Sequence, residues 1–215
     1  MVGTMNDIMN IITHSASVNW SYEWFYNREF DLVVEIGTRN GDSTLSLNKW
    51  ATIKRLVTID PYLQYEDYEH DGSWETSTDK TYEKTKEVLS YYPNIEMIRG
   101  KSSEVVDNFV DESIDFLFID GNHSYDYVLE DLELYYPKVK RGGVITGDDY
   151  FMNKNAYRKK MVQEAVNDFA EKYSLELLHP SYMVDDMSCT PINPRLTDRR
   201  CFHGEYPKNW TFIKP

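Results

Sequence analysis

The sequence has few cysteines, no long apolar run and comparatively few positive charges. Its two cysteines, Cys189 and Cys201, are too few for a disulfide framework and lack the spacing of metal ligands, which indicates a reducing compartment. The chain has no stretch of about 18 consecutive apolar residues and no basic start followed by an apolar run. We therefore expect a soluble cytoplasmic protein without a membrane partner.

Lysine and arginine total 23 against 36 aspartates and glutamates, which gives a formal net charge of −13. Such a surface repels phosphate backbones, so a nucleic-acid substrate is not expected. At 215 residues the chain suits one α/β domain, and we predict a single domain over residues 1–215. The aromatic content of 14% suits a pocket for a sugar or another ring, although ordinary core tyrosines would give the same value.

The stretch that most constrains the fold is 31–44, DLVVEIGTRNGDST. Its short apolar run, interrupted by Glu35, is typical of a parallel strand that is buried on both faces. Gly37 then permits a turn and the close approach of a ligand, and Gly41 does the same one turn later. Ser43 and the next residue lie where a helix begins, so their hydroxyls and the free N–H groups can hold an anionic group. The pattern predicts a strand, a turn and a helix with a nucleotide-like ligand over the turn.

Two phosphate-binding motifs do not fit this turn. A dinucleotide fingerprint needs glycine where Arg39 stands, and a P-loop needs lysine where Asp42 stands. The segment E-I-G-x-x-x-G-x-S instead resembles the first motif of class I S-adenosylmethionine-dependent methyltransferases. This resemblance implies an α/β, Rossmann-like fold with a mostly parallel seven-stranded sheet, helices on both faces and an antiparallel C-terminal hairpin. It also implies S-adenosylmethionine as the cofactor, held at this turn by Glu35, Gly37, Thr38, Asn40, Gly41 and Ser43.

Two further strand ends are predicted to contact the cofactor. The strand Arg55–Asp60 ends in a carboxylate, and Asp60 lies 23 residues after Gly37, close to the spacing at which an acidic side chain binds ribose hydroxyls. The strand Ile95–Arg99 is followed by Ser102, which the resemblance places beside the adenine. A serine at such a turn also caps helices, so the residue type alone does not assign it.

Three carboxylates follow the next two predicted strands. The strand 114–119 ends in Asp120, and the strand 144–146 ends near Asp148 and Asp149. Because neighbouring strand ends lie ~5 Å apart, we expect the three side chains to converge and to repel one another. A hard divalent cation with oxygen ligands, such as Mg²⁺, would remove that conflict.

The segments F-I-D-G-N-H-S-Y and R-G-G-V-I-T-G-D-D-Y make the resemblance more specific. They are similar to metal-dependent O-methyltransferases that modify catechols and, more closely, to those that act on sugar hydroxyls. The resemblance covers residues 31–150. It implies that Asp120, Asp148 and Asp149 hold the metal and that Asp120 also borders the cofactor and the reacting groups.

One position departs from the sugar-acting relatives, several of which carry an aspartate base two residues after the first metal ligand. That position is Asn122 here, and an amide is no useful proton acceptor. The neighbouring His123 is the candidate base, because imidazole titrates near neutral pH. The alternative is that His123 only caps the turn or packs beneath Tyr127.

The predicted function is therefore O-methylation of a hydroxyl on a sugar or glycan, with help from a divalent metal. A phenolic or catechol acceptor is the alternative within the same class. A nicotinamide-dependent oxidoreductase and a non-catalytic binding module are the alternatives from other classes. A saccharide or another small molecule is the expected partner, and a homo-oligomer is left open.

The remaining segments are assigned from composition and helical or strand periodicity. Residues 61–81 are polar, aromatic and turn-rich, which suggests a lid over the substrate. The other assignments are a helical cap over 1–30, a turn at Gly142-Gly143, an antiparallel hairpin built from strands at 174–178 and 210–213, and an irregular segment over 180–207.

Overall fold

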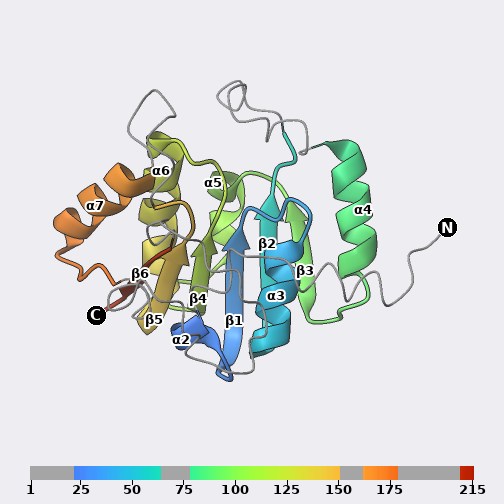
Figure 1. Ribbon diagram of the computed structural model, residues 1–215, viewed down its shortest axis with the longest axis horizontal. Helices are drawn as coiled ribbons and strands as arrows, with labels where there is room; N and C mark the ends of the chain where they lie inside the picture. The colour runs from blue at the N-terminus through green and yellow to red at the C-terminus, as the bar shows by residue number, and fades with distance from the viewer. Residues whose placement is uncertain (1–21, 64–77, 151–161, 179–208) are drawn as a thin grey trace, which may run out of the picture.

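The computed structural model describes residues 22–63, 78–150, 162–178 and 209–215. Within these ranges six strands form one sheet in the order β3-β2-β1-β4-β5-β6 (Figure 1). The first five strands run parallel and β6 is antiparallel to β5, which confirms the predicted fold class. The strands are β1 (Glu29–Ile36), β2 (Thr52–Asp60), β3 (Ile95–Arg99), β4 (Ile114–Ile119), β5 (Val139–Gly147) and β6 (Trp210–Ile213).

Helices cover both faces of the sheet, with α4 and α7 at its two ends in Figure 1. They are α2 (Tyr22–Phe25), α3 (Asp42–Trp50), α4 (Asp79–Leu89), α5 (Ser102–Val105), α6 (Tyr125–Tyr135) and α7 (Val162–Tyr173), with 3-10 turns η4 (Val106–Asn108) and η5 (Tyr136–Lys138). In the described part of the chain, none of these helices has the length and apolar character that crossing a membrane requires.

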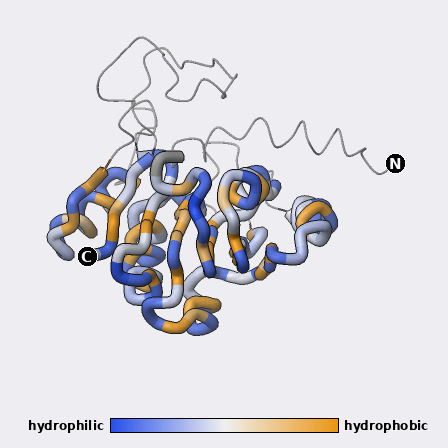
Figure 2. The backbone as a smooth tube through the Cα atoms, turned by 90° about the horizontal axis from the view of Figure 1, so that it is seen from below, coloured by the Kyte–Doolittle hydropathy of each residue, from blue (hydrophilic) through white to orange (hydrophobic). Residues whose placement is uncertain are grey.

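The two faces of β1 build two separate cores. Leu32, Val34 and Ile36 pack with residues of α6 and α7, whereas Val33 packs with α2 and α3 on the opposite face. This alternation follows from the two-residue period of a strand, and it explains why β1 is apolar almost throughout. Figure 2 shows the apolar stretches that result along the strands of the sheet.

The described residues form six strands, not the seven that were predicted. The expected strand at 174–178 is absent, because these residues first end α7: Ser174 has φ 53° and the Leu175 N–H bonds to the Ala170 carbonyl at 2.9 Å. Only Leu178 pairs with β6, exchanging two backbone hydrogen bonds with Thr211 at 2.9 and 3.0 Å. Among the described residues, the antiparallel partner of β5 is β6.

The prediction of a turn at Gly142-Gly143 is also wrong, since both glycines lie inside β5. The pairing of β4 with β5 shifts register between Ile114 and Phe116, opposite these residues. Gly142 has φ 74°, and a Cβ on Gly143 would lie 2.7 Å from a methyl group of Val139. These glycines therefore accommodate an irregularity inside β5, and they do not mark the end of a strand.

Several predicted segments lie wholly or partly outside the described residues. This applies to all of 180–207, to most of the proposed cap over 1–30 and to most of the proposed lid over 61–81. The described end of the cap is α2, whose Trp24 packs against the core on the α3 face. Residues 61–63 and 78–81 of the lid are described, and in the second part the Thr78 hydroxyl accepts the Thr81 N–H at 3.2 Å and so caps α4.

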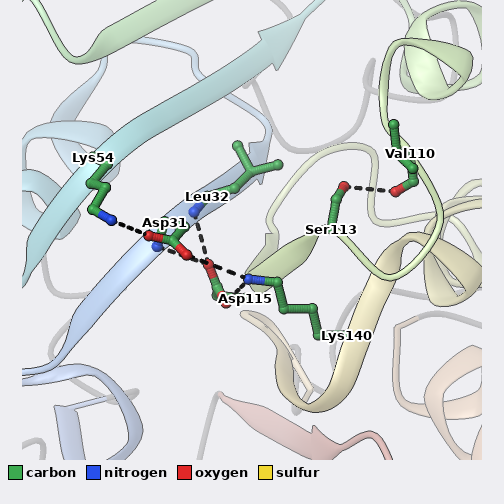
Figure 3. A network of polar contacts seen from close by, with 7 residues as sticks. All are labelled: Asp31, Leu32, Lys54, Val110, Ser113, Asp115 and Lys140. Atoms are coloured by element: carbon green, nitrogen blue, oxygen red, sulfur yellow. Dashed lines mark hydrogen bonds and ion pairs between the residues drawn. The ribbon is translucent and has the colours of Figure 1, made fainter.

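Charge pairs hold the amino-terminal edge of the sheet together (Figure 3). One Asp115 oxygen accepts the backbone N–H groups of Asp31 and Leu32, each at 2.8 Å. Its other oxygen accepts from Lys140 at 2.5 Å, and Asp31 pairs with Lys54 at 2.7 Å. Every carboxylate of this group therefore has a cation or two N–H groups beside it.

Candidate active site

The Gly37 turn brings the tips of β1 and β4 together at the carboxyl-terminal edge of the sheet. The Asp120 N–H donates to the Ile36 carbonyl at 2.8 Å, and Gly37 has φ 104°. A Cβ at Gly37 would lie only 2.0 Å from the Asp120 carbonyl oxygen. The glycine is therefore required by the neighbouring backbone, whether or not a ligand approaches the turn.

Glu35 lies beneath this turn and is fully buried. Its Oε2 accepts hydrogen bonds from the hydroxyls of Thr58, at 2.6 Å, and Thr44, so one carboxylate joins β1, β2 and α3. Burial raises the pKa of Glu35 to about 8 despite these two donors. The second oxygen, Oε1, is buried and has no hydrogen-bond partner among the described residues, which leaves one acceptor for a further donor.

Asp60 ends β2 and is almost completely buried. One of its oxygens accepts the Arg39 N–H at 2.9 Å and the other accepts the Tyr62 N–H at 2.7 Å. Burial raises the pKa of Asp60, and these backbone donors counteract that effect. Because a carboxylate has about four acceptor positions, Asp60 can fix the turn and still receive hydroxyl groups.

The main cluster of the site comprises Asp120, His123 and Asp149. His123 Nε2 lies 3.5 Å from Asp120 Oδ1 and 3.3 Å from Asp149 Oδ2. One ligand atom from each residue falls within 4.8 Å of the others. The three side chains are 20% to 24% exposed, so a ligand can reach them while little water surrounds them.

The electrostatics of this cluster are dominated by burial and by like charge. Burial raises the pKa of Asp120, in opposition to its contact with His123. For His123, burial lowers the pKa, but the hydrogen bond with Asp120 and the charges of the nearby aspartates outweigh it and raise the pKa to about 9. The cluster thus attracts positive charge, and a divalent cation fits its oxygen and nitrogen donors.

Local backbone geometry points these residues toward one another. The Asn122 side chain accepts the Ser124 N–H at 2.9 Å, which makes the tight turn that carries His123. Asn122, not His123, is therefore the residue that caps this turn. Asp149 has φ 59°, a conformation that non-glycine residues adopt mainly where the surrounding structure enforces it.

Asp148 is not a member of this ligand cluster, although its charge is felt at His123. Its backbone N–H contacts the Ile119 carbonyl at 3.3 Å, and its own carbonyl accepts from the indole of Trp210 at 3.2 Å. Trp210 packs so closely that a Cβ on Gly147 would lie 2.4 Å from the ring. Trp210 supports the acidic pair, a role that the sequence did not reveal because it depends on β5–β6 pairing.

Ser102 lies at the start of α5, and its hydroxyl donates to the buried carboxyl group of Asp131 in α6. Its carbonyl accepts the Tyr135 hydroxyl at 3.0 Å. Burial raises the pKa of Asp131 to about 7. Sequence reasoning missed Asp131, because nothing in an amphipathic helix marks which acidic residue turns inward.

The other predicted cofactor residues surround the Gly37 turn. The hydroxyl of Thr38 lies 2.6 Å from that of Thr58, and Asn40 is exposed in the turn. Gly41 precedes α3 with φ 79°, and Ser43 lies partly buried in the first turn of that helix. Their contacts with a cofactor stay predictions.

Comparison with known proteins identifies the family. Residues 34–150 match the family described as a methyltransferase domain, which is more than half of the chain. An uncharacterized protein of Acanthamoeba polyphaga mimivirus is 32% identical over 165 residues, covering 74% of this chain and 68% of that protein.

Solved structures share the fold at low sequence identity. A putative methyltransferase of Haloferax volcanii, in complex with the Trm112 activator, has a TM-score of 0.56 at 16% identity and covers 98% of this chain and 92% of that one. A putative caffeoyl-CoA O-methyltransferase of Staphylococcus aureus scores 0.52 at 16% identity, with coverage of 100% and 85%. An rRNA methylase of Streptococcus thermophilus scores 0.53 at 17% identity, with coverage of 100% and 98%.

The family match begins in β1, two residues before Ile36, and ends at Tyr150, directly after the acidic pair. It therefore includes the Gly37 turn, Asp60 and the cluster of Asp120, His123 and Asp149. The chain belongs to the methyltransferase-domain family and is an S-adenosylmethionine-dependent methyltransferase.

Proposed function

We propose that this methyltransferase alkylates a hydroxyl oxygen of a sugar or glycan, with the help of a divalent cation held at the carboxyl-terminal edge of the sheet. The observation that carries the proposal is the cluster of Asp120, His123 and Asp149 beside the Gly37 turn. Asp148 is proposed to complete the acidic environment. The printed ion-pair contacts of Asp120 and Asp149 among the described residues are with His123, and such a group of like charges favours a cationic ligand over an anionic substrate.

The cofactor is proposed to lie over the Gly37 turn, with its ribose on Asp60 and its amino acid part near Glu35. Both carboxylates are buried, and Glu35 Oε1 has no partner among the described residues, so a donor from the cofactor would satisfy it. Ser102 is proposed to border the adenine through the turn that follows β3. The Asp131 contact would then fix that turn in place.

The reaction needs an oxygen placed in line behind the methyl carbon of the sulfonium. The C–S bond breaks as the C–O bond forms, giving S-adenosylhomocysteine and a methyl ether, and the hydroxyl proton leaves to a base. A bound divalent cation would lower the pKa of the hydroxyl and fix its orientation. The chain's own residues orient the two reactants, and the largely buried cluster keeps water away from the developing alkoxide.

A sugar is preferred over a phenol because the D-G-N-H and D-D-Y segments resemble the sugar-acting enzymes. A phenolic acceptor is the second candidate, and the likeness to the putative caffeoyl-CoA enzyme is the observation that favours it. Mass-spectrometric detection of methylated products from a panel of saccharides and catechols separates the two. Methylation of catechols alone would overturn the sugar assignment.

The proposed division of roles predicts distinct losses for two variants. Asp60→Asn should weaken S-adenosylmethionine binding by about 10-fold, because one charged acceptor for the ribose is lost, whereas Asp148→Asn should leave that binding nearly unchanged. Isothermal titration with the cofactor and a turnover assay with and without chelator measure both. Equal loss of cofactor binding in the two variants would contradict the division.

A further inference from the structure

The ring of His123 lies between two carboxylates from different strand ends. The same atom, Nε2, lies 3.5 Å from an oxygen of Asp120 and 3.3 Å from an oxygen of Asp149. Asp120 follows β4, and Asp149 follows β5, so the three groups converge from separate parts of the chain. Two oxygens and one nitrogen thus lie within 4.8 Å of one another.

An ion pair with protonated histidine accounts poorly for these distances. Charge-assisted N–H···O bonds are usually about 2.7–2.9 Å long, and both contacts are longer. One N–H shared between two acceptors could make only a bent three-centre bond, which is weaker than a linear one. Adjacent ligands on an ion with ~2.1 Å bonds lie about 3 Å apart, and the two distances from Nε2, 3.5 and 3.3 Å, are close to that value.

A free base is also a poor description of His123. A histidine that takes a proton from a substrate presents one ring nitrogen to it, while an acceptor holds the N–H of the other nitrogen. Here Nε2 is directed at the carboxylates. The other nitrogen, Nδ1, is buried and has no hydrogen-bond partner among the described residues.

The backbone fixes the ring in this position. The Asn122 side chain closes the turn onto the Ser124 N–H, and α6 begins directly afterwards at Tyr125. Opposite the ring, Asp149 holds its left-handed backbone conformation with φ 59°. The convergence of Nε2 with the two oxygens is therefore set by the fold on both sides.

We propose that His123 is a metal ligand through Nε2, completing a three-residue set with Asp120 and Asp149 that binds a first-row transition cation more tightly than Mg²⁺. Imidazole nitrogen suits Mn²⁺, Fe²⁺, Co²⁺ and Zn²⁺ better than it suits Mg²⁺, which prefers oxygen ligands and keeps its water. The inference rests on the proposed function in one respect, namely that a cation binds at this site. If His123 binds the cation, it is not the base, and the proton of the substrate hydroxyl is taken by another group or by water.

Pulsed electron paramagnetic resonance of Mn²⁺ added at one equivalent tests this ligand set directly. The echo modulation should contain a directly bound ¹⁴N nucleus, and protein labelled with ¹⁵N-histidine should change that signal. His123→Gln should remove the nitrogen coupling and weaken Mn²⁺ binding by about 10- to 100-fold. The control, Asp126→Asn, removes an exposed carboxylate three residues away and should change neither measurement.

Competition then measures the preference, since Mg²⁺ should need on the order of 100-fold excess to displace Mn²⁺. Mn²⁺ that binds with Asp120 and Asp149 but without nitrogen coupling would overturn the role of His123 and leave the proposed function intact. Equal affinity for the two ions would overturn the preference. No cation binding together with turnover in chelator would overturn the metal-assisted function as well.

Discussion

Asp31 and Asp115, at the amino-terminal edge of the sheet, face Lys54 and Lys140, whereas at the carboxyl-terminal edge Asp120 and Asp149 face His123. The hydrogen bond and charge of Lys54 lower the pKa of Asp31. Burial raises the pKa of Asp60 and of Asp120. Among the described residues, the carboxylates of the first edge are paired with lysines, whereas those of the second edge are mainly desolvated.

The difference follows from chain direction. In a parallel sheet the strand starts form one edge and the strand ends form the other, so the two edges can carry unrelated chemistry. The starts of β1 and β4 carry Asp31 and Asp115, and the starts of β2 and β5 carry the lysines that pair with them. The ends of β1, β2, β4 and β5 deliver Glu35, Asp60, Asp120 and the pair after Gly147.

The largest expected effect separates the same substitution at the two edges. Asp149→Asn should lower methyl transfer on the order of 1,000-fold, equivalent to about 4 kcal/mol, because it removes a proposed cation ligand. Asp115→Asn should leave the rate unchanged and lower the stability of the fold instead. Formation of S-adenosylhomocysteine and urea unfolding measure the two effects, and equal loss of rate would break the comparison.

The next effect concerns the close approach of β1 and β4 at the site. Gly37→Ala should destabilise the protein by at least about 3 kcal/mol, since it adds a backbone clash to an unfavourable φ. Gly142→Ala is the matched control: its φ is 74°, but a Cβ there meets nothing within 4 Å. It should therefore show only the conformational part, about 1–2 kcal/mol. Equal urea midpoints for the two variants would mean that the contact with Asp120 has no energetic weight.

A smaller effect is the pH dependence of stability that Asp131 introduces. Its pKa rises from the ordinary value of 3.8 to about 7 in the folded state, so the folded protein holds a proton that the unfolded chain has released between those values. The free energy of unfolding should therefore fall as the pH rises through this range, by an amount on the order of a few kcal/mol. Asp131→Asn should flatten that fall in thermal melts between pH 4 and pH 7. An unchanged slope would show that the carboxyl group ionises freely.

The smallest effect has the opposite sign and belongs to the other edge. Because the pKa of Asp31 is lowered in the folded state, its ion pair contributes to stability above the ordinary pKa of 3.8. This contribution disappears as the pH falls through the folded value. Asp31→Asn should therefore remove a slight gain in stability above about pH 4. High salt should remove the same gain, since Asp31 and Lys54 are exposed. A change larger than that of Asp131→Asn would reverse the ranking of the two edges.

Much of the framework follows from local pattern. Short apolar runs in the sequence predicted β1, β2, β3 and β4, and Gly37 predicted the turn after β1. Each of these signals is contained in a few consecutive residues, so it can be recognised without knowing the tertiary structure. The convergence of Asp120 with Asp149 followed from the rule that parallel strands end at one edge. The glycines of β5 misled the prediction because glycine marks a turn and a strand irregularity equally well.

Details of the site depend on contacts between distant segments. The hydrogen bond from the Thr58 hydroxyl to Glu35 joins β2 to β1. The hydrogen bond from the Ser102 hydroxyl to Asp131 joins the turn after β3 to α6. Trp210 reaches Asp148 only because β6 pairs antiparallel with β5 in one particular register. No periodicity within a single segment contains that information.

The sequence by itself determined the alternation of strands and helices, the turn after β1 and the presence of acidic residues at strand ends, because each depends on neighbours along the chain. The tertiary structure alone decided that His123, and not Asp148, lies between the two carboxylates, and which threonines and tryptophan support them. The physical reason is that distances between side chains of different strands are fixed by register and packing, which arise only when the whole sheet has formed.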